Sequence, residues 1–223
     1  MSIRRILQND PPSMDAPASE VAPEGHTLPW HDVDDRAEDR YGRVAVEACR
    51  VWEAWQREDE LAWLLRRIEG ASSLLEVGRA RGGTLWAACQ VLLAEARITS
   101  IDSWTYTGQE TARFLSMTRE NQQLSLVRGD SVETMERMRH RTERYDVVLI
   151  DADHERVYED WVAAQPLVRP GGVIGFHDIY GIREHTGRVP ELWQTLRRHH
   201  PKTTREYVTA RDAIWGGWGL IRR

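Results

Sequence analysis

The stretch YDVVLIDADHERVYEDW, residues 145–161, decides the fold because it joins a buried strand to a helix through a polar turn. Its apolar run, VVLI, is typical of a parallel strand that is covered on both faces. Asp151, Asp153 and His154 follow at the carboxyl end of this strand, and a helix is predicted over 155–168. Ionised carboxylates repel each other and resist burial. We therefore expect a metal ion, a cationic cofactor or a proton transfer to explain this arrangement.

Strand-like and helix-like segments alternate on both sides of this stretch. Strands are predicted over 73–77, 98–102, 124–130, 145–151 and 171–178, and helices over 84–96, 111–119, 131–139, 155–168 and 190–199. Such alternation predicts an α/β fold with a doubly wound, mostly parallel sheet and helices on both faces. Two β-rich runs, 204–208 and 213–221, have no helix between them, so we expect an antiparallel C-terminal hairpin.

The N-terminal part has a different composition. Five of the nine prolines fall within residues 11–29, and the segment lacks hydrophobic periodicity. Apolar spacing then predicts two helices, over 41–55 and 61–68. The expected organisation is a flexible N-terminal tail or lid (1–38), helices that form a cap or a dimer face (39–70), and one α/β domain (71–223).

Charge and composition narrow the class of protein. The net charge of −5 gives no overall basic field that would attract nucleic acid. We find no apolar run near the roughly 20 residues of a membrane span, and no apolar core of a signal peptide at the start. The two cysteines, Cys49 and Cys89, lie in apolar helical patterns and are predicted to be free thiols. These features favour a cytoplasmic protein without a nucleic-acid or membrane partner.

The segment LLEVGRARGGT, residues 74–84, predicts a glycine turn between a strand and a helix. Gly78 permits a tight turn and close approach of a ligand to the backbone, and Gly82 spares volume where the helix begins. Glycine turns also join strands to helices without any ligand. Glu76 lies inside the strand, where its carboxylate disfavours a pyrophosphate and favours a cationic or amino-bearing ligand.

Acids also end the next two predicted strands. Asp102 stands where a carboxylate can accept hydrogen bonds from both hydroxyls of a ribose. Asp130 can accept a hydrogen bond from an adenine amino group, or it can cap the helix that begins beside Ser131. Both interpretations of Asp130 stay open at this point.

The fourth and fifth predicted strands bring Asp151, His177 and Asp178 to the same edge of the sheet. Neighbouring strands are about 4.8 Å apart, so these side chains can converge. Carboxylates suit Mg²⁺, whereas a histidine ligand shifts the preference toward Mn²⁺, Fe²⁺ or Zn²⁺. His154 can accept a proton, or it can be a surface residue of the following helix, whose N-cap Asp153 is expected to be. Asp178 can also be a loop cap.

Aromatic residues have two interpretations. Trp52, Trp55 and Trp63 either pack in the core or form an aromatic wall beside a flat substrate. Trp104 and Tyr106 either pack near an adenine and the acceptor pocket or are structural. The loop 180–189 is expected to border the acceptor site.

Together, LLEVGRARGG, ITSID, VRGDS, YDVVLIDADH and RPGGVIGFHD, in this order, resemble the motifs of class I S-adenosylmethionine (SAM)-dependent methyltransferases. The resemblance covers about 72–223 and implies a Rossmann-like sheet. It also implies cofactor contacts by a set of residues along the strand ends: Glu76, Gly78, Gly82, Asp102, Ser103, Asp130 and Ser131. The chain departs from the family at Arg79 and Arg81, where smaller residues are commoner.

The pattern IDADHERVYEDW…PLVRPGGVIGFHDI…VPELWQTLR is similar to a narrower branch, the macrocin-type sugar O-methyltransferases and the cephalosporin hydroxylase-like group. Metal-dependent catechol and caffeoyl-CoA O-methyltransferases are more distant relatives. The resemblance implies metal ligands at Asp151, His177 and Asp178, although an acidic or amide residue is usual at 177. It implies a general base at His154, and the expected catalytic residues are His154 and Asp151.

The expected function is therefore methyl transfer from SAM to a hydroxyl of a small molecule, a sugar-bearing natural product or a phenolic, assisted by a divalent metal, most simply Mg²⁺. A homo-oligomer is compatible with the early helices. The alternatives are a catalytically silent relative that binds SAM or a partner, and a hydroxylase-like enzyme on the same fold. A nicotinamide enzyme is disfavoured by Glu76, and a DNA amino-methyltransferase by the sequence DADH after the fourth strand.

Overall fold

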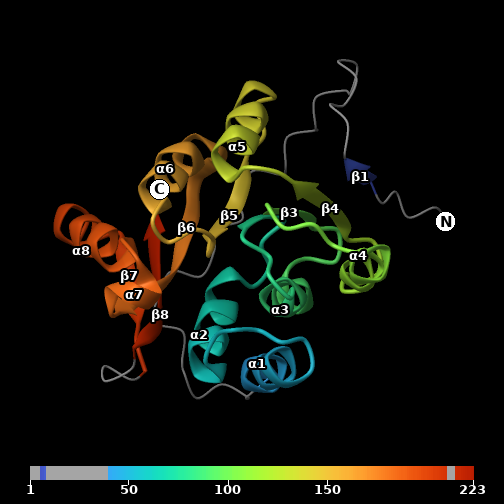
Figure 1. Cartoon of the computed structure of the whole chain (residues 1–223), viewed down its shortest axis with the longest axis horizontal. Helices are drawn as coiled ribbons and strands as arrows, with labels where there is room; N and C mark the ends of the chain where they lie inside the picture. The colour runs from blue at the N-terminus through green and yellow to red at the C-terminus, as the bar shows by residue number, and fades with distance from the viewer. Residues whose placement is uncertain (1–5, 9–39, 210–213) are drawn as a thin grey trace.

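The structure, a computed structural model, describes residues 6–8, 40–209 and 214–223. Its strands are β1 (Ile6–Gln8), β2 (Ser73–Val77), β3 (Arg97–Asp102), β4 (Gln123–Arg128), β5 (Tyr145–Ile150), β6 (Val168–Gly181), β7 (Thr204–Tyr207) and β8 (Trp215–Arg222). Its helices are α1 (Arg40–Arg50), α2 (Glu58–Ile68), α3 (Gly83–Val91), α4 (Gly108–Leu115), α5 (Ser131–His140), α6 (Val157–Ala164), the short 3₁₀ helix η1 (Gln165–Leu167), α7 (Arg183–Thr186) and α8 (Val189–His199). Figure 1 shows these elements along the chain.

The strands form one sheet in the order β1-β4-β3-β2-β5-β6-β8-β7. Pairings from β1 to β6 are parallel, whereas β8 is antiparallel to both β6 and β7. The predicted α/β class with an antiparallel C-terminal pair is thus confirmed. The chain runs outward from β2 to β4 and then returns to the other side of β2 with β5. The carboxyl ends of β2 and β5 therefore flank a topological switch point, where open α/β sheets bind their ligands.

Helices cover both faces of the sheet because its central strands carry apolar side chains on both faces. Every residue of β2 and β5 is buried. Side chains alternate along a strand, so Val147 and Leu149 pack with α1, α2 and α3, whereas Val148 and Ile150 pack with the opposite cluster, which includes α6 and α8. Figure 1 shows α1, α2 and α3 together on one side of the sheet and α5 and α6 on the other.

Several predicted boundaries were wrong for local physical reasons. The first helix ends at Arg50 rather than near Trp55, and Glu53 has a positive φ of 59° in the loop that follows. Helix α4 begins early because Thr107 and Glu110 form a capping box. Helix α6 gives way to η1, which contains Pro166, a residue without a backbone N–H to continue the helix.

Further boundaries shift by a few residues. Helix α3 stops at Val91, strand β4 at Arg128 and β8 at Arg222. Strand β6 is longer than predicted, and its pairing with β8 shifts between His177 and Tyr180. Such an irregularity reorients side chains at the end of a strand, and it falls beside the predicted metal ligands.

Only part of the N-terminal organisation predicted for residues 1–70 lies within the described residues. The tail or lid of 1–38 lies outside the described residues except for β1, whose backbone pairs with β4. The helices expected in 39–70 are present as α1 and α2 and pack against α3 and the sheet. Within the described ranges, every helix is too short or too polar to cross a membrane. Cys49 and Cys89 are free thiols.

Candidate active site

A cavity of about 490 Å³ opens at the carboxyl ends of β2, β3 and β5. The glycine turn after β2 forms one wall, and the ends of β5 and β6 form another. Predicted site residues that line it are Gly78, Gly82, Asp102, Ser103, Asp130, Ser131, Asp151, His154, His177 and Asp178. The loop between α1 and α2 contributes a further wall, which includes Trp55 and Gln56.

The glycine turn packs directly on the end of β5. Gly78 has a φ of +91°, and a Cβ there would lie 1.9 Å from the carbonyl oxygen of Asp151. Gly82 has a φ of +84°, and a Cβ there would lie 2.8 Å from the ring of Phe114. Both positions therefore require glycine, because a side chain would meet strain and close contacts together. The two glycines therefore allow the turn to pack tightly against β5 and α4 while it lines the cavity.

Asp102 organises the loops on both sides of the β3 end. Its Oδ2 accepts hydrogen bonds from the amides of Arg79 and Ala80, at 2.8 and 3.0 Å, and from the hydroxyl of Tyr106 at 2.9 Å. Its Oδ1 accepts one from the amide of Trp104 at 2.7 Å. A carboxylate has about four acceptor sites, so these protein donors occupy most of its capacity. A ribose contact by Asp102 stays a prediction, and it would have to share this carboxylate with the turn.

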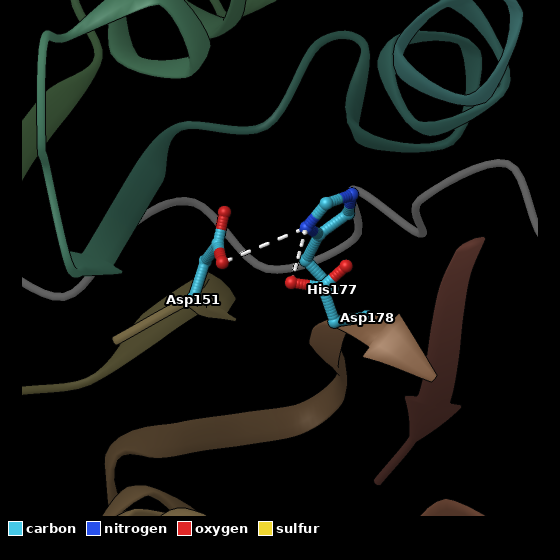
Figure 2. Close-up of side chains that lie close together, drawn as sticks. All are labelled: Asp151, His177 and Asp178. Atoms are coloured by element: carbon cyan, nitrogen blue, oxygen red, sulfur yellow. Dashed lines mark ion pairs between the residues drawn. The ribbon is translucent and has the colours of Figure 1, made fainter. Parts of the chain in front are cut away.

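Asp151, His177 and Asp178 all line the cavity, and Figure 2 shows that their side chains converge. Nδ1 of His177 lies 3.6 Å from Oδ1 of Asp151 and 3.4 Å from Oδ2 of Asp178. One ligand atom of each residue lies within 4.8 Å of the others. Asp178 has a positive φ of 58°, next to the irregularity in β6, and its Oδ1 is buried without a hydrogen-bond partner.

The charges of this cluster are strongly coupled. Burial alone would raise the pKa of Asp151, but the positive His177 and His154 beside it hold that pKa well below its usual value. Burial would lower the pKa of His177, but the charges of Asp151 and Asp178 outweigh it and raise the pKa to about 10. The site thus compensates its carboxylates with a cation. A divalent ion fits the same donor set of two carboxylates and an imidazole.

A family model described as a methyltransferase domain matches residues 75–179. Among solved structures, the chain is 18 % identical to an O-methyltransferase from Bacillus cereus in complex with SAH, the demethylated product of SAM; the match covers 88 % of this chain and 84 % of that one, with a TM-score of 0.58. It is 18 % identical to TomG from Streptomyces achromogenes, an O-methyltransferase of tomaymycin synthesis in complex with SAM, over 83 % and 91 % of the two chains, with a TM-score of 0.53.

The chain has a methyltransferase fold. It is also similar to the MycE methyltransferase of the mycinamycin biosynthetic pathway, solved with Mg and SAH, at 15 % identity and a TM-score of 0.56. That match covers 82 % of this chain but 54 % of MycE. No match was found among curated proteins.

Within this methyltransferase fold, Glu76 lies beneath the glycine turn rather than on the cavity wall. It is 2 % exposed, and its Oε2 accepts a hydrogen bond from the hydroxyl of Ser100 at 2.5 Å. The guanidinium of Arg79 donates to the carbonyl oxygen of Ser100 and packs on the ring of Tyr106, so this unusual arginine points into the protein. Burial raises the pKa of Glu76 to about 7. Its predicted contact with the methionine part of a cofactor stays a prediction.

Glu76→Gln is expected to flatten the dependence of stability on pH. The folded protein holds the Glu76 proton up to about pH 7, whereas the unfolded chain releases it near pH 4.5. Between these values the unfolded state binds fewer protons, so the free energy of unfolding of the wild type falls as pH rises, by up to ~3 kcal/mol. Urea unfolding at about pH 5 and about pH 8 measures this difference. The exposed Glu120→Gln should keep the wild-type slope, and equal slopes in all three proteins would refute the assignment.

Asp130 and Ser131 lie on the cavity wall but are already engaged with the protein. Asp130 caps α5 by accepting a hydrogen bond from the amide of Glu133 at 3.0 Å, and it pairs with Arg156 at 2.5 Å. The hydroxyl of Ser131 donates to Asp160. Asp130 therefore is the N-cap of α5, which was one of its two interpretations from the sequence. An adenine contact by Asp130 stays a prediction and would compete with Arg156.

His154 presents one ring nitrogen to the acidic cluster. Its Nδ1 lies 2.8 Å from the carbonyl oxygen of His185, so the Nδ1 proton is held there and Nε2 faces the cavity. Nε2 lies 3.3 Å from Asp178 and 3.8 Å from Asp151. The neighbouring Asp151 carboxylate is the main cause that raises the pKa of His154. The loop 180–189, expected near the acceptor, thus holds this histidine in place. Asp153 does not cap α6, whose N-cap is Arg156, but accepts a hydrogen bond from the amide of Glu155.

The structure brings three residues to this site that the sequence analysis did not assign to it firmly. Gln56 donates a hydrogen bond from Nε2 to Oδ2 of Asp151 at 2.8 Å. Glu60 is buried next to His177. Trp55 is 57 % exposed and meets Trp104, 50 % exposed, with ring centroids 6.4 Å apart. The open aromatic wall therefore exists at Trp55, whereas Trp63 is buried in the core.

Proposed function

We propose that this protein is a SAM-dependent O-methyltransferase that acts on a hydroxyl group of a small molecule with the help of a divalent cation. The observation that carries the proposal is the convergence of Asp151, His177 and Asp178 on the same cavity as the glycine turn. A glycine turn and a possible metal-ligand set side by side in one cavity suit a reaction that brings two substrates together.

The chain's own residues can supply the steps of methyl transfer. Gly78 and Gly82 line the cavity, and this turn would hold the methionine part of SAM. The hydroxyl oxygen of the acceptor attacks the methyl carbon, the bond from that carbon to sulfur breaks, and SAH is the second product. When His154 is neutral, its proton stays on Nδ1 beside the carbonyl oxygen of His185, and the unprotonated Nε2 can accept the hydroxyl proton.

Asp151, His177 and Asp178 would hold the cation. A bound divalent ion lowers the pKa of a coordinated hydroxyl and fixes its position. Mg²⁺ matches the two carboxylates, and MycE, whose fold is similar, was solved with Mg and SAH. The imidazole of His177 favours Mn²⁺, Fe²⁺ or Zn²⁺ if it binds the metal.

The acceptor is proposed to be a sugar-bearing natural product or a phenolic. Trp55 and Trp104 expose large aromatic surfaces at the cavity wall. Such surfaces pack against flat rings and against the apolar faces of sugars. We propose a cytoplasmic enzyme with no nucleic-acid partner, in agreement with the net charge of −5.

Calorimetric titration of SAM into the chelated protein, with and without added Mg²⁺ or Mn²⁺, tests the proposal. We expect micromolar binding in both conditions, and SAH formation from catechols, phenols or glycosides only when the metal is present. Absence of SAM binding in both conditions would remove the methyltransferase function. Binding without any metal effect on turnover would remove only the metal.

A further inference from the structure

Two buried polar side chains, those of Gln56 and Glu60, approach the cluster of Asp151, His177 and Asp178. Both residues precede the segment 75–179 that matches the methyltransferase domain. Gln56 lies in the loop between α1 and α2, and Glu60 lies in the first turn of α2. They are 8 % and 1 % exposed. Burial of an amide and a carboxylate is costly unless each has a specific partner, so both residues need an explanation.

Glu60 faces the rear of the His177 ring. Its Oε2 lies 4.0 Å from Nε2 of His177, and both atoms are buried without a hydrogen-bond partner. The ring of Trp218 packs against His177 with centroids 5.0 Å apart, and Trp215 meets it at 6.2 Å. Two indole rings therefore border the imidazole. Among the described residues, Glu60 is the acid that lies within ion-pair distance of Nε2.

The opposite nitrogen of His177 faces the proposed cation. Nδ1 is the atom that approaches Asp151 and Asp178 (Figure 2). A histidine that binds a metal through one nitrogen usually donates the other N–H to a carboxylate, which fixes its tautomer and orientation. A movement of about 1 Å would bring Nε2 and Oε2 to hydrogen-bonding distance. His177 and Glu60 are thus placed as a metal-binding imidazole and the carboxylate that accepts its other N–H.

Gln56 fixes Asp151 in a similar way. Its Oε1 accepts a hydrogen bond from the hydroxyl of Thr84 at 2.7 Å, which directs Nε2 toward Oδ2 of Asp151 at 2.8 Å. Oδ2 is therefore occupied, and Oδ1 is the oxygen that faces His177 and His154. The amide orientation selects which carboxylate oxygen is presented to the cavity.

We infer that Gln56 and Glu60 are positioning residues that orient Asp151 and His177 as ligands of a divalent transition metal, for which we take Mn²⁺ as the probe. The inference rests on the metal of the proposed function and extends it to α2 and the loop before it. With Nε2–H directed at Glu60, Nδ1 is a neutral nitrogen donor. The site should then bind Mn²⁺ more tightly than Mg²⁺, which has little affinity for nitrogen.

The test is a calorimetric titration of Mn²⁺ into the full chain after chelation, without SAM or acceptor. Glu60→Met and Gln56→Met are each expected to weaken Mn²⁺ binding about 10- to 100-fold, as loss of an outer hydrogen-bond partner does. Glu60→Gln keeps an acceptor and should recover part of the affinity. Glu58→Gln is the matched control, because Glu58 lies on the same helix but pairs with Arg50 at the surface. Thermal unfolding checks that each variant is folded.

The ¹⁵N chemical shifts of His177 provide a second readout, which does not require measurement of enzyme activity. In the Zn²⁺-loaded wild type we expect a protonated Nε2 with the shift of a hydrogen-bonded N–H, and in Glu60→Met a shift that moves toward that of an N–H without a strong acceptor. Wild-type Mn²⁺ affinity in folded Glu60→Met, Glu60→Gln and Gln56→Met would overturn the inference. So would a wild type that binds no Mn²⁺, even if it binds SAM. Tight, Glu60-dependent Mn²⁺ binding without SAM binding would support the inference and reject the proposed function.

Discussion

Asp151→Asn is expected to lower the rate of the proposed metal-dependent methyl transfer by about 10³-fold, which corresponds to ~4 kcal/mol of transition-state stabilisation. The substitution keeps the size of the side chain and an oxygen that can accept the hydrogen bond from Gln56. It removes the negative charge that His177 and His154 face. Mn²⁺ affinity should fall by more than about 100-fold, because a ligand is lost rather than an outer partner. Calorimetry and initial rates of SAH formation measure both effects.

SAM affinity of the same variant should stay within about threefold of the wild type, because the glycine turn contacts the backbone of residue 151 rather than its carboxylate. Asp153→Asn is the control: it lies two residues away, is exposed, and accepts a hydrogen bond from the amide of Glu155. It should retain turnover and Mn²⁺ affinity. Full turnover in Asp151→Asn would exclude a metal ligand at this position.

Gly78→Ala is expected to abolish cofactor binding and to destabilise the fold. The new Cβ would lie 1.9 Å from the carbonyl oxygen of Asp151 and 2.6 Å from its carbonyl carbon, and the φ of +91° is itself unfavourable for alanine. Neither neighbour is a flexible side chain, so the turn and the end of β5 must separate. We expect a loss of about 3 kcal/mol or more in the free energy of unfolding and a fall in SAM affinity of about 100-fold or more.

Gly108→Ala separates this effect from the general cost of replacing glycine. A Cβ at Gly108 meets nothing within 4 Å, and the residue begins α4. Alanine there should be neutral or slightly stabilising, by up to ~1 kcal/mol. Urea unfolding and SAM titration of the two variants side by side provide the measurement. Equal behaviour of the two would mean that the turn does not pack against β5 as described.

The order of strands and helices could be predicted because the buried strands have strong local signals. Residues 73–77 and 145–150 are short, largely apolar runs, SLLEV and YDVVLI, and glycine or an acidic residue follows each where the strand ends. The positions of the strand ends also predicted that Asp151, His177 and Asp178 lie at one edge of the sheet. In the structure these three side chains converge there. Parallel strands make such predictions possible because their carboxyl ends share one edge.

The engagement of the other predicted residues could not be derived from spacing. Asp102 accepts hydrogen bonds from two different loops, and Asp130 is shared between a helix cap and Arg156. These contacts depend on how loops fold back, which hydrophobic periodicity does not encode. Gln56 was missed for a related reason: periodicity continued the first helix to Trp55, whereas α1 ends at Arg50 and frees the loop to reach Asp151.

The position of β8 has a consequence for the order of events during synthesis. Although Trp215–Arg222 follow every other strand of the described sheet along the chain, they lie between β6 and β7. During synthesis, β6 therefore lacks its antiparallel partner until these residues have left the ribosome. Pairing of strands that are distant in sequence is a slow type of folding step. Trp218 arrives with this strand and packs against His177. The wall of the cavity around His177 is therefore completed only after Trp215–Arg222 have been synthesised, so the proposed cation site forms later than the parallel part of the described sheet.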